Sequence, residues 1–236
     1  MSLMKARRDV KRSYQSKLRG AQAQSTRAAV IAAAGRLFTE QGYASTSIDE
    51  IAAVAGVSRA TVFTAVGGKA KLLKTALDVA IVGDDEPVPL PERPRSKAIR
   101  AERDPRKYLA LYAELVTEMD GRMAGIHEAL RGAAGVDAEA KALWESQLAQ
   151  HRQGAANVVA DLMRKGDLKQ GLDPAAAADI VWLLGPGTYS MLVHRRGWSP
   201  GQFQTWLTET FIGQLLPPSL SRKAASRTSG VRRVRR

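Results

Sequence analysis

The sequence predicts an all-α protein, with a small N-terminal domain of helices followed by a larger helical domain. Apolar residues recur three and four positions apart through most of the chain, which is the spacing of one helix face. Helix-start signals precede several of these patterns, namely Ser47-Ile48-Asp49-Glu50, Asp104-Pro105, Asp137, Asp173-Pro174 and Ser199-Pro200. No stretch alternates apolar and polar residues as a half-buried strand does.

The net charge of +13 is concentrated at the two ends of the chain. Residues 1–25 contain seven Lys or Arg and one Asp, and residues 217–236 contain seven Lys or Arg and no acid, so residues 26–216 have no net charge. Both ends are poor in large apolar residues, and we expect a basic disordered arm over 1–25 and a basic disordered tail over 217–236. Such segments either add salt-dependent affinity for phosphate or only keep the protein in solution.

Two absences limit the class of protein. The chain has no cysteine, which excludes disulfides and thiolate metal sites and suits a reducing compartment. We find no apolar run near the ~20 residues of a membrane helix and no signal peptide, so we expect a soluble cytoplasmic protein with no membrane partner.

The N-terminal domain is expected over residues 26–82, with its helices separated by glycines. The first helix begins near Thr26 and ends at Gly42, and a second helix of two turns is capped by Ser47. Gly56 permits a positive φ, and Ser58 caps a third helix that reaches about Phe63. Gly67-Gly68 then separates this helix from a fourth, which Gly83 closes.

A short helix, a glycine turn and a second short helix led by small polar residues make a helix-turn-helix, whose second helix enters the DNA major groove. Arg59 is the long cation that can reach guanine, and Thr61 and Thr64 suit a thymine methyl or a phosphate. Lys69 and Thr46 stand at helix starts, where phosphate binds. The predicted DNA-binding residues are Thr46, Ser47, Ser58, Arg59, Ala60, Thr61, Phe63, Thr64 and Lys69.

This stretch resembles the DNA-binding domain of TetR-family repressors over about residues 26–82. The matching positions are Gly42-Tyr43, Thr46-Ser47-Ile48, Ile51-Ala52, Ala55-Gly56-Val57-Ser58, Phe63 and Lys69-x-x-Leu72-Leu73. The family usually has Tyr-x-His-Phe-Pro-Ser-Lys where this chain has Phe63 to Lys69, so the phosphate contact of the family's tyrosine hydroxyl is not carried over. For Phe63 we favour a core position over contact with the DNA backbone.

Residues 83–216 are expected to form a helical domain for ligand sensing and dimerisation. An acidic and proline-rich linker, 84–94, precedes a helix from Asp104-Pro105 to about Met119, a short helix over 123–130 and a long helix from Asp137. Gly185-Pro186-Gly187 interrupts the next helix, and Ser199-Pro200 opens the last. The last two helices are apolar round much of their circumference. We therefore expect them to pair with their copies in a homodimer, as the TetR resemblance also implies.

The TetR resemblance also implies a pocket for a small-molecule effector inside the helical domain. We expect an uncharged or weakly polar metabolite, drug or acyl compound as its occupant. The candidate lining residues, each of which also suits an ordinary core position, are Tyr112, Met119, Met123, His127, Trp144, Leu162, Trp182 and Tyr189.

No motif for catalysis, metal or cofactor binding is found in the sequence, so we predict neither an enzyme nor a metal or cofactor protein. The predicted function is that of a bacterial, ligand-responsive repressor, which binds a palindromic operator as a dimer and is released by its effector. The alternative is an architectural or DNA-coating protein without sequence preference, which the basic ends alone would explain.

Overall fold

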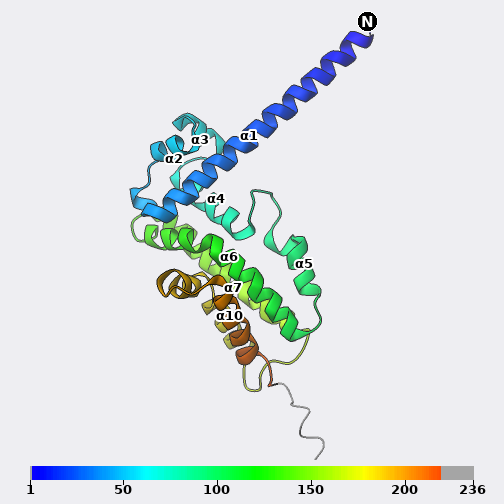
Figure 1. The fold of residues 1–236 in the computed structure, drawn as a ribbon, viewed down its shortest axis with the longest axis vertical. Helices are drawn as coiled ribbons and strands as arrows, with labels where there is room; N and C mark the ends of the chain where they lie inside the picture. The colour runs from blue at the N-terminus through cyan, green and yellow to red at the C-terminus, as the bar shows by residue number, and fades with distance from the viewer. Residues whose placement is uncertain (1, 219–236) are drawn as a thin grey trace, which may run out of the picture.

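The structure, a computed structural model, describes the backbone of residues 2–218 and the side chains of residues 18–218. Within this part of the chain all regular structure is helical, as predicted. The predicted tail 217–236 lies outside the described residues except for Pro217 and Pro218. Figure 1 shows one long helix, α1 (Ser2–Ser45), whose N-terminal half stands clear of the remaining helices.

The expectation of a disordered arm over residues 1–25 is wrong for residues 2–25, which form the first part of α1. The segment contains no proline and is rich in Ala, Arg, Lys and Gln, which have high helix propensity. The prediction of disorder from high net charge fails here because residues 2–25 continue the packed part of α1. A helical extension of this kind needs no apolar face of its own. Gly42, with φ of 82° and ψ of 167°, interrupts the helical geometry where the sequence indicated the end.

The next three helices follow the predicted caps closely. Ser47 and Glu50 form a reciprocal capping box at the start of α2 (Ile48–Ala55), which ends at Gly56 with φ of 67°. The Ser58 hydroxyl accepts from the Thr61 amide at 3.1 Å and starts α3 (Arg59–Ala65). The chain then enters α4 (Lys69–Val82), which closes at Gly83 with φ of 97°.

The predicted linker 84–94 is more ordered than expected and leads into a helix that the sequence analysis missed. A 3-10 turn, η1 (Leu90–Glu92), is followed by α5 (Pro94–Ala101), in which Pro94 occupies a position where proline suits a helix start. The Arg93 guanidinium fastens the loop by donating to the Asp84 carboxylate at 2.5 and 2.7 Å and to the Val88 carbonyl at 3.0 Å. The bond from Arg93 lowers the pKa of Asp84 to about 2.

A single helix, α6 (Pro105–Ala133), replaces the two shorter helices predicted over 104–130. The Asp104 side chain caps it through the amides of Arg106 and Lys107. Gly121 and Gly125 lie inside this helix and do not break it. Both are sites of close approach, since a Cβ on Gly121 would stand 3.1 Å from the Tyr189 hydroxyl and one on Gly125 would stand 3.1 Å from Thr39 Cβ.

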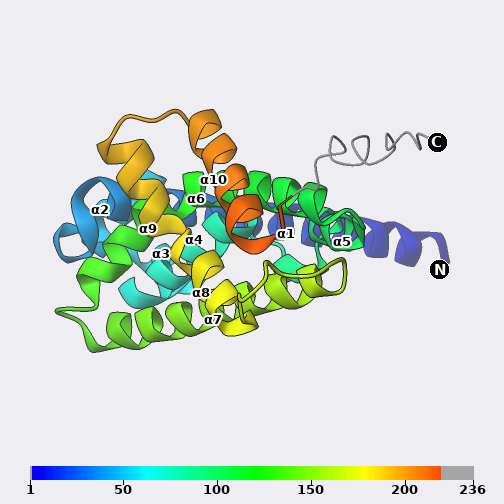
Figure 2. The same ribbon diagram turned by 90° about the horizontal axis from the view of Figure 1, so that it is seen from below.

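The remaining helices begin at the predicted signals. Asp137 caps α7 (Ala138–Met163), Asp173 caps α8 (Pro174–Leu183), and Ser199 with Gln202 forms a capping box on α10 (Pro200–Leu215). The predicted break at Gly185-Pro186-Gly187 separates α8 from α9 (Pro186–Tyr189), which runs into a π-helical segment, η2 (Ser190–Arg195). Figure 2 shows α7 and α8 side by side, with α9 and α10 above them in this view.

One stretch corrects the expectation about apolar runs. Pro174–Arg195 is long and apolar enough to cross a membrane by length and composition, with a mean hydropathy of 1.2, and 39% of it is buried in the protomer. The helix break at Gly185 lies inside it. Leu183 and Met191 are its exposed large apolar side chains, and their pairing with a partner subunit stays a prediction.

The helices enclose two apolar clusters, and α6 contributes to both. The first cluster joins α1–α4 to the C-terminal half of α6 and includes Ile126 and Leu130. The second lies among α6, α7, α8, α9 and α10 and includes Leu109 and Phe211. Met119 packs against both clusters. The predicted boundary at residues 82–83 is therefore a boundary in sequence, while in space the DNA-binding domain is completed by α6.

The two α6 glycines Gly125 and Gly132 give a matched test of this packing. Gly132→Ala has open space around the new Cβ, so it is expected to stabilise by about 0.5–1 kcal/mol through helix propensity. Gly125→Ala forces α1 and α6 apart at Thr39 and is expected to destabilise by about 1–3 kcal/mol. Urea unfolding monitored by circular dichroism measures both. Equal stabilisation by the two changes would show that α1 and α6 do not approach closely at Thr39.

Candidate DNA-binding site

The helix-turn-helix of α2, the Gly56 turn and α3 places most of the predicted DNA-binding residues on the surface. Ser47, Ser58, Arg59, Ala60 and Thr64 are exposed, and Thr61 is half-buried. Ile51 anchors α2 and Val62 anchors α3, because both side chains are fully buried in the first cluster. Figure 1 shows α2 and α3 together at one side of α1, away from α7 and α10.

Arg59 is the first residue of α3 and is held by a neighbour in α2. Its guanidinium donates to the Asp49 carboxylate at 2.7 Å, and its side chain remains 57% exposed. The guanidinium carbon also lies 5.6 Å from the centre of the Phe63 ring. The free protein therefore carries the predicted guanine reader in a solvent-screened ion pair, which contributes about 0–1 kcal/mol and yields readily to a better acceptor.

The expectation of a core position for Phe63 is wrong, because its side chain is 46% exposed. Successive residues of a helix point about 100° apart, and Val62 already occupies the inward position of this short helix. Phe63 is thus an exposed aromatic ring on the recognition helix, beside Arg59.

Thr46 is also corrected, since it is only 2% exposed and lies in the turn between α1 and α2. Its hydroxyl donates to the Gly42 carbonyl at 2.8 Å and can accept from the Gln41 amide at 3.5 Å. The residue fixes the turn and does not offer its hydroxyl to a phosphate.

The other hydroxyls of the motif are engaged in local bonds. Ser47 caps α2, and Ser58 and Thr61 share a hydrogen bond of 2.8 Å at the start of α3. The Thr64 hydroxyl donates to the carbonyls of Ala60 and Thr61 at 3.1 and 3.0 Å. These bonds fix the side chains before DNA arrives, and their part in contacting DNA stays a prediction.

Lys69 starts α4 with its ammonium above an aromatic ring. Lys69 Nζ lies 4.3 Å from the centre of the Tyr43 ring and 3.4 Å from the Ala44 carbonyl, to which it donates. Partial burial lowers the pKa of Lys69, while Asp137 and Glu50 oppose this shift. Burial also raises the pKa of Tyr43 to about 12, and its hydroxyl donates to Asp137 at 3.2 Å. Tyr43 and Lys69 thus join the ends of α1, α4 and α7.

Sequence reasoning missed Arg27 as a support of the recognition helix. The Arg27 guanidinium donates to the carbonyl of Ala65, the last residue of α3, at 2.8 Å. It also forms an ion pair with Asp85 at 2.5 Å, and this bond raises the pKa of Arg27. Arg27 therefore positions α3 from α1, and only the fold reveals this role because its partners lie 38 and 58 residues away.

The eight predicted effector-binding residues do not come together at one place. Tyr112, Leu162, Trp182 and Tyr189 belong to the second cluster, whereas Met123 and Trp144 belong to the first and Met119 contacts both. The His127 ring lies tilted against the Trp144 ring with ring centres 4.9 Å apart, and burial lowers the pKa of His127 to about 4, so it is neutral at pH 7. These residues therefore divide between the two clusters, and their part in binding an effector stays a prediction.

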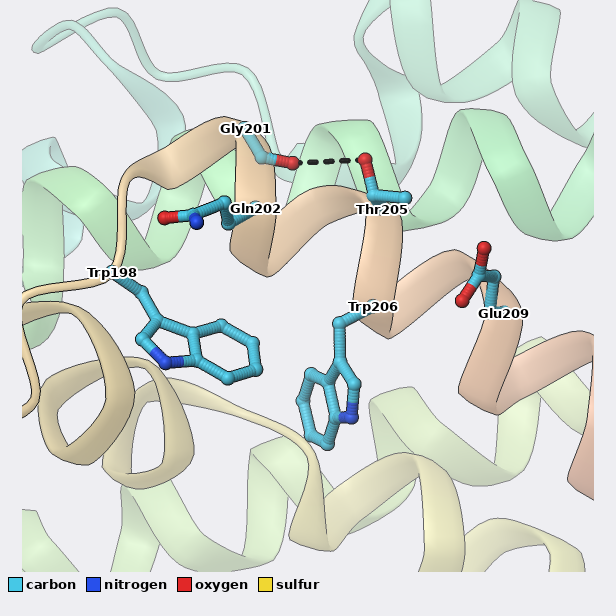
Figure 3. Close-up of a pocket in the computed structure, with 6 residues that line it drawn as sticks. All are labelled: Trp198, Gly201, Gln202, Thr205, Trp206 and Glu209. Carbon is cyan, nitrogen blue, oxygen red and sulfur yellow. Dashed lines mark hydrogen bonds between the residues drawn. The ribbon is translucent and has the colours of Figure 1, made fainter.

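A groove of about 450 Å³ lies elsewhere, along the first turns of α10. Its lining residues are Trp198, Gly201, Gln202, Thr205, Trp206 and Glu209, and Figure 3 shows that the two tryptophan rings form one side of it. The rings meet edge to face with centres 6.0 Å apart. None of the eight predicted residues lines this groove.

A residue absent from the predicted set, Asp120, is the most unusual polar group of the helical domain. It is completely buried on α6, and neither carboxylate oxygen has a hydrogen-bond partner. One sequence signal marks it: Asp120 stands between Val116 and Ala124, four residues away on either side, on the apolar face of α6.

Comparison with known proteins agrees with this geometry. Residues 30–76 match the family model of bacterial regulatory proteins of the tetR family. The HTH-type transcriptional regulator TtgR of Pseudomonas putida is 28% identical over 195 residues, covering 75% of this chain and 89% of TtgR.

Two solved structures share the fold. NalD, the secondary repressor of the MexAB-OprM multidrug efflux pump in Pseudomonas aeruginosa, is 24% identical with a TM-score of 0.61, covering 82% of this chain and 98% of NalD. The transcriptional regulator FadR of Bacillus subtilis, solved in complex with stearoyl-CoA, is 18% identical with a TM-score of 0.61, covering 78% and 96% of the two chains.

An exposed recognition helix on a helix-turn-helix, joined to a larger all-helical domain, defines a DNA-binding transcriptional regulator and not an enzyme. Its residues 30–76 match the tetR family of bacterial regulatory proteins, and the relatives that it resembles are transcriptional regulators.

We expect Arg59 and Asp49 to have opposite effects on DNA binding. Arg59→Ala is expected to cost about 1–3 kcal/mol at the operator and to relax the preference at one base pair of each half-site. Asp49→Asn removes the carboxylate that holds Arg59 and repels phosphate, so affinity is expected to rise, more so at low salt.

Fluorescence anisotropy with operator and scrambled duplexes measures these effects. Arg131→Ala serves as the control, because Arg131 is an equally exposed arginine in an ion pair outside the motif, with Glu128 at 2.8 Å. Unchanged base preference in Arg59→Ala would remove Arg59 from the recognition surface.

Proposed function

We propose that this protein is a ligand-responsive repressor, which binds a palindromic operator as a homodimer and is released from it by a small-molecule effector. The observation that carries the proposal is the placement of Arg59 on an exposed recognition helix whose domain is completed by α6 of the helical domain. The proposed site of action is the bacterial cytoplasm, where the operator lies.

Apolar surface on the C-terminal helices supports the dimer. The side chains of Leu183 at the end of α8 and Met191 in η2 are 66% and 60% exposed. The groove lined by Trp198, just before α10, and Trp206 of α10 adjoins the same group of helices. Pairing these surfaces about a two-fold axis would bury them, and would carry two copies of α3 to half-sites about 34 Å apart on one face of DNA.

The shared helix α6 supports control by an effector. Arg122 of α6 donates from Nε to the Ala80 carbonyl at 2.9 Å and from Nη2 to the Ile81 carbonyl at 3.2 Å. These carbonyls belong to the last turn of α4, so a shift of α6 is transmitted to the helix that follows the recognition helix. An occupant of the second cluster would act on DNA affinity by this route.

One observation favours the architectural alternative. The first part of α1 belongs to a segment with a net charge of +6 and stands clear of the rest of the protomer. A basic helix of this kind binds phosphate without regard to sequence. Sequence preference separates the two functions, since a repressor prefers its operator over random DNA by about 10³ or more.

Selection of sites from random duplex DNA by the full chain tests the proposal. At about physiological salt we expect a two-fold symmetric motif with half-sites one helical turn apart. Leu183→Glu places a charge on the proposed dimer surface and is expected to give monomers that no longer select this motif. Val136→Glu is the control, because Val136 is 75% exposed in the turn between α6 and α7. Recovery of unselected sequence by the parent protein would favour the architectural function.

Removal of the Arg122 contact is expected to loosen α4. Arg122→Met keeps the aliphatic stem and leaves two α4 carbonyls without their donor, so the free energy of unfolding is expected to fall by about 0.5–1.5 kcal/mol. Hydrogen exchange is expected to accelerate in the last turn of α4, and operator affinity to fall with it. Arg106→Met is the control at the opposite end of α6, where Arg106 donates to the Pro217 carbonyl at 2.8 Å. Unchanged exchange in α4 would contradict this route of coupling.

A further inference from the structure

Asp120 is a buried carboxyl group to which the free protein gives no partner. Its side chain has no exposed surface, and both oxygens lack a hydrogen bond. The other buried aspartate among the described side chains, Asp161 on α7, differs because it forms an ion pair with Arg164. The remaining buried atoms without a partner belong to the neutral groups of Ser96, His127 and Trp182.

An unpaired carboxyl in an apolar core opposes folding in either protonation state. Burying the ionised form without a counter-charge costs far more than burying a neutral group, and burial accordingly raises the pKa of Asp120 well above its usual range. The protonated form still carries a donor with nothing to accept from it. The group therefore contributes nothing to the fold, whereas a partner brought into this low-dielectric site would interact with it strongly.

Two tyrosines flank this carboxyl group. Burial raises the pKa of Tyr112, two turns earlier on α6, and that of Tyr189 at the end of α9, and the Asp120 carboxylate adds to both shifts. The Tyr189 hydroxyl reaches the α6 backbone at Gly121, where a Cβ would stand 3.1 Å from it. Neither hydroxyl makes a hydrogen bond with Asp120, so neither tyrosine satisfies the carboxyl group.

The tyrosine rings are in turn held by α10. Tyr189 meets Phe203 edge to face with ring centres 5.0 Å apart, and Tyr112 lies 5.8 Å from Phe211. A carboxyl group with aromatic rings around it has the composition of a site for an organic cation, since the carboxylate supplies the counter-charge and ring faces attract the cation. Tyr112 and Met119, the residue before Asp120, remain partly exposed.

We propose that the effector site of this protein centres on Asp120 and takes an organic cation, namely a protonated or quaternary amine on an apolar body. The cation replaces the proton of the buried carboxyl, which passes to solvent, and its apolar body packs against Tyr112 and Tyr189. This inference rests on the proposed function and replaces the uncharged effector expected from the sequence. Asp120 precedes Arg122 by two residues, so its occupant acts on the helix that holds α4.

A series of probes with one body and three head groups tests the charge requirement. 4-Phenylbutylammonium, 4-phenylbutanol and 4-phenylbutyrate share their apolar part and differ in charge, and tetraphenylphosphonium adds a bulkier cation. Isothermal titration of the full chain without DNA is expected to give the order ammonium, alcohol, carboxylate, with at least about tenfold between the first two. Equal binding of ammonium and alcohol, or no binding of either cation, overturns the proposal.

Two variants locate the site. Asp120→Asn keeps the shape of the side chain and removes its charge, so it is expected to lose about tenfold or more in affinity for the cations while binding 4-phenylbutanol as before. Asp161→Asn removes the paired buried carboxylate and is expected to bind all probes like the parent protein. Thermal unfolding gives the second measurement: Asp120→Asn is expected to be at least as stable as the parent. A marked loss of stability with unchanged cation binding would make Asp120 a structural residue and overturn the assignment.

Operator binding separates this inference from the proposed function. If the cations bind through Asp120 and lower operator affinity, both stand. If the parent protein selects an operator and a neutral compound releases it equally well from Asp120→Asn, the repressor function stands and the cation site is wrong. If cations bind through Asp120 but no operator is selected, the site stands and the repressor function fails.

Discussion

The sharing of α6 between two apolar clusters is the constraint on which the rest of the structure depends. Ile126 and Leu130 complete the core of the DNA-binding domain, and Leu109 and Val116 belong to the core of the helical domain. A continuous helix of 29 residues transmits displacement along its axis because its backbone bonds resist local change. The core beneath the recognition helix is built by α1–α4 and completed by α6, so a change in the packing of α6 reaches that core.

Contacts of α6 with α1 and α4, and of α1 with α3, fix the position of the DNA-binding helices further. Gly125 permits close approach to Thr39 of α1, and Arg122 holds the last turn of α4. Arg27 then fixes the end of α3 from α1. These three contacts join α6 to α1 and α4, and α1 to the end of α3. Under the proposed function, a movement of α6 near Asp120 would reach the recognition helix through them.

Much of the fold was predictable because caps and glycine turns are local. Ser47, Ser58, Asp137, Asp173 and Ser199 all cap helices as the sequence indicated, since a side-chain oxygen and the amides it satisfies lie within a few residues of each other. The helical state of residues 2–25 and the joining of two predicted helices into α6 were missed. In both places a strongly predicted helix extends into a neighbouring segment whose own helix signals are weak. Local sequence patterns underestimate this extension.

The site was less predictable because burial depends on distant residues. Polarity and spacing correctly predict that Arg59 and Ser58 are exposed. They also predict an exposed Thr46 and a buried Phe63, and the packing of the helices reverses both predictions. Aromatic and sulfur side chains likewise predict an apolar pocket, and Asp120 is not among them. A charged residue on an apolar helix face is the stronger signal, because its burial needs a compensating partner.

The distribution of charge divides recognition between two parts of the chain. Residues 26–216 carry no net charge, so base contacts by α3 act with little help from long-range attraction, while the basic segment 1–25 supplies attraction that salt weakens. Under the proposed function, raising the ionic strength is expected to lower affinity for all DNA and to leave the difference between operator and random sequence largely to Arg59 and its neighbours. Sequence preference then depends on how α3 is held, and hence on the packing of α6.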